Sequence, residues 1–85
     1  MRYTYRPRGV CSQQITFEID DGKLHDVRFA GGCNGNLKAI GMLSEGMDAK
    51  KVADMFRGNT CGYRDTSCAD QFSKAIGEAL RQSAR

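Results

Sequence analysis

Four cysteines are the residues best suited to chemistry in this chain of 85 residues. They are Cys11, Cys33, Cys61 and Cys68. None of the gaps between them is the gap of about two to four residues that joins ligand pairs in zinc ribbons, so spacing alone is a weak indication of a metal site. Thiolates bind metals and attack disulfides, so the chemistry open to these residues is metal binding or thiol redox chemistry.

A hairpin is predicted between the first two cysteines. In residues 14–20 every second side chain is apolar, which is the pattern of a strand with one buried face. Asp21-Gly22 predicts a tight turn, and residues 25–30 predict the return strand. Because a hairpin brings the start of one strand beside the end of the next, we expect Cys11 and Cys33 to be neighbours at one end of the sheet.

Three helices are predicted after the hairpin. Asn36 is expected to cap the first, which ends near Gly46, and Asp48 to cap the second, which ends at Gly58. The third is expected to open in residues 67–70, where Ser67 and Asp70 have the spacing of a capping box. Its apolar stripe, predicted to be core, is Phe72, Ala75, Ile76, Ala79 and Leu80.

A short edge strand is predicted before the hairpin, because Tyr3 and Tyr5 alternate with polar residues up to Pro7. These elements predict an α+β fold: a three-stranded antiparallel sheet covered on one face by three helices, in a single domain over residues 1–85. The exposed edge of the first strand could pair with a second copy, which would give a homodimer.

The cysteines are expected at the ends of these elements. Cys33 leads into the first helix, Cys68 opens the third, and a helix N-terminus favours the thiolate form. All four cysteines avoid the apolar faces on which inert buried cysteines lie. We therefore favour one shared thiolate site, either a closed tetrahedral Zn²⁺ site or an iron–sulfur cluster, over disulfides or scattered thiols.

No catalytic residue is predicted. The only histidine, His25, is expected in the middle of its strand, facing the core with Val27 and Phe29, and is not assigned as a ligand. The sequence contains no P-loop, dinucleotide-binding fingerprint or Ser/His/Asp arrangement. The chain is also too short to hold the barrel of a ribonucleotide reductase.

The composition of the chain limits the classes of partner that we expect. With 13 Lys and Arg against 10 Asp and Glu, the net charge of +3 permits an acidic partner but does not predict nucleic acid. The apolar runs are far shorter than the about 18 residues of a membrane span. Residues 1–8 lack the apolar segment of a secretory signal, so we expect a cytoplasmic protein, where lasting disulfides are rare.

Residues 66–70, which read Thr-Ser-Cys-Ala-Asp, resemble the signature of the TSCPD domain family, with Ala69 where the family has proline. Residues 32–37 and Cys61-Gly62 resemble the family as well, so the likeness covers nearly the whole chain. It is closest to a stand-alone, four-cysteine branch, and related domains occur at the C-terminus of certain ribonucleotide reductases. The resemblance implies a metal-binding accessory module that serves a protein partner such as ribonucleotide reductase.

The order of the elements is similar, more distantly, to iron–sulfur scaffold proteins of the NifU/IscU type. In those proteins one cysteine precedes the central strand, one follows the hairpin and one opens a late helix, as Cys11, Cys33 and Cys68 do here. Gln13 stands where the scaffolds have an acidic residue and Ser67 where they have histidine, while Cys61 is an additional thiol. This resemblance implies a NifU/IscU-like fold with a fully thiolate-ligated site.

Three functions remain open at this point. The first is a small metal-binding module, with zinc as the expected metal, and the second is an iron–sulfur scaffold or carrier. The third is a thiol/disulfide redox protein in which Cys61 and Cys68 exchange. It ranks last because the gap between these two residues is looser than that of thioredoxin-like motifs.

Overall fold

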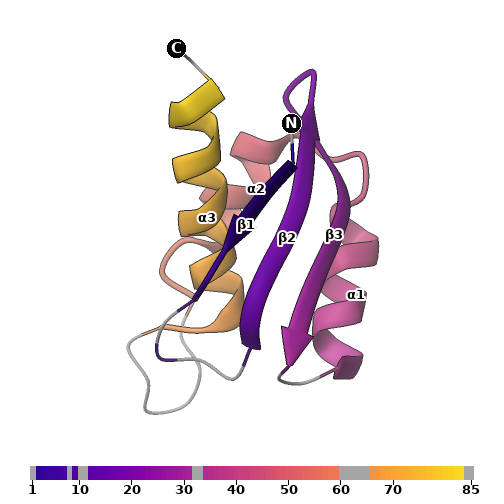
Figure 1. The fold of residues 1–85 in the computed structure, drawn as a ribbon, viewed down its shortest axis with the longest axis vertical. Helices are drawn as coiled ribbons and strands as arrows, with labels where there is room; N and C mark the ends of the chain where they lie inside the picture. The colour runs from indigo at the N-terminus through magenta and orange to yellow at the C-terminus, as the bar shows by residue number, and fades with distance from the viewer. Residues whose placement is uncertain (1, 8, 10–11, 32–33, 60–65, 84–85) are drawn as a thin grey trace.

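Three strands are followed by three helices along the chain (Figure 1). The computed structural model describes residues 2–7, 9, 12–31, 34–59 and 66–83. The elements are β1 (Arg2–Tyr5), β2 (Ser12–Asp20), β3 (Lys23–Gly31), α1 (Asn34–Ser44), α2 (Ala49–Phe56) and α3 (Cys68–Ser83). This arrangement confirms the predicted α+β fold. No helix in the described part of the chain is long and apolar enough to cross a membrane.

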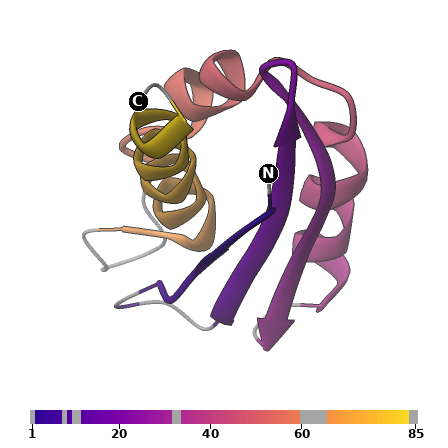
Figure 2. The same cartoon turned by 45° about the horizontal axis from the view of Figure 1, so that its top comes forward.

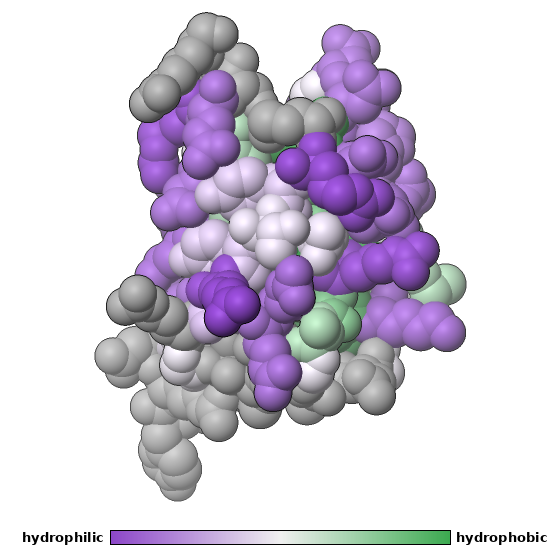
Figure 3. Space-filling model, viewed as in Figure 1, coloured by the Kyte–Doolittle hydropathy of each residue, from purple (hydrophilic) through white to green (hydrophobic). Residues whose placement is uncertain are grey.

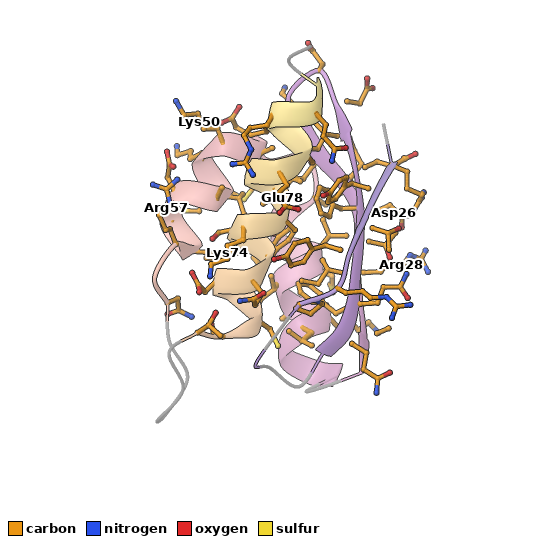
Figure 4. All side chains as sticks on the ribbon, turned by 60° about the vertical axis from the view of Figure 1, so that its left-hand side comes forward. Asp26, Arg28, Lys50, Arg57, Lys74 and Glu78 are labelled. Atoms are coloured by element: carbon orange, nitrogen blue, oxygen red, sulfur yellow. The ribbon has the colours of Figure 1, made fainter. Side chains whose placement is uncertain are left out.

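The sheet has the order β1-β2-β3, and both pairs of neighbouring strands are antiparallel. The central strand carries the cleanest alternation, and its inward side chains Ile15, Phe17 and Ile19 are all buried. Figure 4 shows the helices on one side of the sheet and the labelled side chains of Asp26 and Arg28 on the other. The sheet therefore has one packed face and one polar face, as its alternation predicts.

Phe72 of α3 is the centre of the core and is fully buried. Its ring lies 5.6 Å from that of Phe17, 5.5 Å from that of Phe29 and 6.3 Å from that of Phe56, measured between centroids. One side chain thus joins β2, β3, α2 and α3. The predicted stripe on α3 is confirmed: Phe72, Ala75, Ile76 and Ala79 are buried, and Leu80 packs against them.

The three helices take different places over the sheet. In Figure 2, α3 lies on the β1 side, α1 runs beside β3, and α2 lies near the β2–β3 turn. The second helix begins as predicted, because the Asp48 carboxylate accepts a hydrogen bond from the Lys51 N–H at 3.0 Å. The predicted start of α1 is wrong: Asn36 is expected to precede the helix as its cap, but the helix begins at Asn34, so Asn36 lies inside its first turn. Asparagine is favoured at helix N-caps, but this preference alone does not fix the residue at which a helix begins.

A bulge in β3 overturns the predicted direction of His25. Thr16 pairs with Arg28 but Glu18 pairs with His25, so β3 holds one more residue than β2 between these pairs. Asp26 lies inside the bulge with φ of 53°. Because His25 pairs with Glu18, it faces away from the core, and its Nδ1 lies 2.8 Å from a carboxylate oxygen of Glu45.

The outer edge of β3 is covered by α1 and the turn that follows it. The Leu24 N–H donates to the Met47 carbonyl at 2.8 Å, and the Gly46 N–H donates to the Leu24 carbonyl at 2.7 Å. Gly41 of α1 lies so close to the strand that a Cβ there would sit 2.7 Å from the Val27 carbonyl oxygen. Glycine at this position therefore sets the distance between α1 and β3.

Substitution of two helical glycines tests this close approach. Gly41→Ala should lower the free energy of unfolding by about 1 kcal/mol or more, because the clash with a backbone oxygen outweighs the better helix propensity of alanine. Gly77→Ala in α3 is the matched control, since a Cβ there meets nothing within 4 Å. It should raise stability by about 0.5–1 kcal/mol. Urea denaturation measures both, and equal effects of the two substitutions would contradict the α1–β3 contact.

Candidate functional site

Of the four predicted site residues, the structure describes Cys68, while Cys11, Cys33 and Cys61 lie outside the described residues. Cys68 is the first residue of α3 and is half-buried. In the described part of the chain, no three His, Cys, Asp or Glu side chains come together as a metal-binding group. Only one of the four predicted ligands belongs to that part. The structural support for a shared site therefore comes from the described residues that flank the four cysteines in the sequence.

The residues that flank the first two cysteines lie at one end of the sheet. Ser12, which directly follows Cys11 in the sequence, pairs with Gly31, two positions before Cys33. Figure 1 shows the start of β2, the end of β3 and the start of α1 at the lower end of the molecule, where α3 also begins. The hairpin predicts that Cys11 and Cys33 are neighbours at this end of the sheet.

The flanks of the other two cysteines are hydrogen-bonded to each other. The Ser67 hydroxyl donates to the Asn59 carbonyl, and the Asn59 side-chain amide donates back to the Ser67 hydroxyl at 3.3 Å. Gly9 lies beside the same segment, since a Cβ there would be 3.5 Å from the Thr66 methyl group. Residues two positions before Cys11 and two positions before Cys61 thus both lie at the start of α3.

Ser67 caps the helix that Cys68 opens. The Asp70 N–H donates to the Ser67 hydroxyl at 3.1 Å, which confirms the predicted N-cap. The first turn of α3, which begins with Cys68, is therefore held in place by this cap. A thiol at the start of a helix lies where the backbone N–H groups and the dipole favour negative charge.

The carboxylate of Asp70 takes a different partner from the one that a capping box predicts. It is buried, and it accepts hydrogen bonds from the Gly58 N–H at 2.8 Å and from the Thr66 hydroxyl. These two bonds, the one from Thr66 above all, hold the pKa of Asp70 below its usual value. Because Gly58 follows α2, Asp70 joins the end of α2 to the start of α3.

Gln71 connects this arrangement to the sheet. Its side-chain amide donates to the Thr66 hydroxyl at 3.0 Å, and its amide oxygen lies 3.5 Å from the Tyr5 hydroxyl at the end of β1. Sequence reasoning missed Gly58, Asn59 and Gln71 as neighbours of Cys68. Gly58 indicated the end of α2. Nothing in the sequence pattern indicated that the Gly58 N–H would donate a hydrogen bond to the Asp70 carboxylate of α3.

Asp70→Asn tests the link between α2 and α3. We expect the substitution to lower the free energy of unfolding by about 1–3 kcal/mol at neutral pH, since both hydrogen bonds end on a buried charge. A lowered folded-state pKa means that the stabilisation is present above the unfolded pKa and is lost as the pH falls through the folded pKa. The difference from wild type should therefore shrink in urea denaturation as the pH falls below the ordinary Asp pKa of 3.8.

The matched control is Asp54→Asn, because Asp54 is an exposed residue of α2 whose carboxylate pairs with Arg57 at 3.2 Å. An exposed pair of this kind is worth about 0–1 kcal/mol. A loss in Asp54→Asn as large as that in Asp70→Asn, or a difference for Asp70→Asn that stays constant in acid, would contradict the assignment.

Comparison with known proteins gives one family. The model of the TSCPD domain matches residues 2–82, which is almost the whole chain. No curated protein and no solved structure matches the chain, so the likeness to NifU/IscU scaffolds stays a prediction. The family match spans both halves of the fold and includes all four cysteines and the residues that hold the start of α3. The chain therefore belongs to the TSCPD domain family.

Proposed function

We propose that this chain is a small cytoplasmic metal-binding module in which Cys11, Cys33, Cys61 and Cys68 together hold one zinc ion. The observation that carries the proposal is the gathering of the described flanks of all four cysteines at one end of the fold. The pairs that support it are Ser12 with Gly31, Asn59 with Ser67, and Gly9 with Thr66.

The donor set fits the metal. Four thiolates satisfy the tetrahedral coordination of Zn²⁺ and leave no open position, which is the pattern of a structural rather than a catalytic site. Zinc bound in this way would join the β2–β3 hairpin to the segment between α2 and α3. The binding free energy would then add to the stability of a chain whose apolar core is small.

The contacts around Cys68 support a role as a ligand. Thr66 and Ser67 are hydrogen-bonded to Asp70, and these bonds hold the start of the helix on which Cys68 is the first residue. Residues that orient a ligand in this way commonly surround metal sites and raise their affinity. The same donors suit an iron–sulfur cluster, and the spectrum described below separates the two cases.

The accessory role rests on the family. Related TSCPD domains are joined to ribonucleotide reductases, so we propose that a protein partner of this kind uses the module. The modest net charge of +3 is compatible with such a partner and gives no reason to propose nucleic acid as an alternative.

Metal analysis of anaerobically purified protein tests the proposal. We expect one zinc per chain, no labile sulfide and no absorbance in the visible range, and chelation should lower the thermal midpoint because metal binding is coupled to folding. Iron together with sulfide would assign a cluster instead. Absence of both metals from the purified protein would leave thiol redox chemistry as the remaining function.

Cys68→Ser should reduce zinc content and thermal stability together. His25→Ala is the control, because His25 faces away from the core and is bonded to Glu45, so it should keep the full zinc content. Zinc that stays stoichiometric in Cys68→Ser, or that is lost in His25→Ala, would overturn the ligand assignment.

A further inference from the structure

We propose that the groove between β3 and α1 is the docking site for an extended segment of a partner protein that carries apolar and acidic side chains. The groove has a volume of about 720 Å³, within the about 300–1,000 Å³ that is typical of ligand sites. The inference rests on the partner-binding part of the proposed function and does not depend on the metal.

The groove is elongated along both of its walls. One wall is formed by four successive residues of β3, from Asp26 to Phe29, which span about 13 Å of strand. The other is one face of α1, where Lys38 and Met42 lie at helical spacing, and it is continued by Glu45 in the turn directly after the helix. A segment of about four extended residues matches this length.

The floor of the groove is apolar. Phe29 and Leu37 line it from the two sides, and Gly41, which also lines it, places no side chain over the Val27 carbonyl. Leu37 is buried and Phe29 packs against the core, so the floor is part of the folded structure rather than a loose surface. An apolar side chain of a partner would extend this part of the core.

The apolar surface continues beyond the groove. Met42 at its rim is 70% exposed and the adjacent Leu43 is 75% exposed. Figure 3 shows a small apolar area in green at the lower middle of this face and a separate pale green side chain at its right edge, with hydrophilic residues in purple between them. A small ligand in the groove would leave Leu43 in water, whereas a protein segment with its flanking structure would cover both residues.

Charge indicates which partner fits. The Asp26 carboxylate is bound by Arg2 and Arg28, each at 2.8 Å, and Glu45 is bonded to His25. The acids of the groove are thus already paired within the chain. By contrast, no acid of the described residues lies within ion-pair distance of Lys38.

Arg28 adds a second cation, on the β3 wall of the groove. Its side chain is 76% exposed and uses its Nε for Asp26, and the described residues give its terminal nitrogens no ion pair. Two cations beside an apolar floor select carboxylates next to apolar side chains. The complementary segment therefore combines leucine- or phenylalanine-like residues with Asp or Glu.

Selection from a phage-displayed library of random peptides, with the purified full chain as bait, tests the inference. We expect enriched peptides to carry Asp or Glu next to a large apolar residue. Met42→Glu should weaken their binding by about tenfold or more, and Lys38→Glu should weaken it as well. Amide shifts in NMR titrations with the enriched peptides should centre on Val27, Phe29 and Gly41.

Two substitutions on α2 are matched controls, because they place the same changes on another exposed helix. Met55, which is 54% exposed, and Lys51 lie outside the groove, so Met55→Glu and Lys51→Glu should keep affinity within about twofold. Zinc content measured on all four variants separates this inference from the metal proposal, since each should retain the metal of the wild type.

Three results would overturn the inference. They are the absence of enriched peptides, enrichment of cationic peptides, and equal binding by wild type and Met42→Glu. Light scattering adds a fourth: a dimer that Met42→Glu dissociates would make a second copy of the chain the occupant of the groove.

Discussion

A buried carboxylate holds together the part of the molecule where the chemistry is proposed. Asp70 accepts hydrogen bonds from the Gly58 N–H and the Thr66 hydroxyl, so the end of α2 and the start of α3 are fixed relative to each other. Because Ser67 caps the same helix and also bonds to Asn59, the segment that leads to Cys68 has a defined path. These contacts fix the start of the helix on which one of the four proposed ligands, Cys68, is the first residue.

The two proposed surfaces share the same elements. β3 and α1 line the groove, and both reach the end of the fold where the flanks of the cysteines gather (Figure 1). A partner segment seated along β3 would therefore lie near the proposed metal. Zinc in such a module would stabilise the end of the sheet from which β3 and α1 extend, which is a structural use of the metal and requires no catalytic group.

The sequence predicts those features that depend on local periodicity. Ile15, Phe17 and Ile19 alternate, and the stripe that begins at Phe72 repeats at helical spacing, so the packed faces of β2 and α3 are correct. The direction of His25 is wrong because a single extra residue at Asp26 reverses the alternation beyond it, and residue types do not reveal a bulge. The partner of Asp70 could not be predicted either, since the contact joins two helices whose packing is a tertiary property.

The central claim is that four thiolates share one metal. X-ray absorption spectroscopy at the zinc edge of the purified full chain tests it most directly, because the fine structure reports the number and type of ligand atoms. The account predicts four sulfur ligands at about 2.3 Å. A first shell that contains nitrogen or oxygen, or fewer than four sulfur atoms, would contradict it.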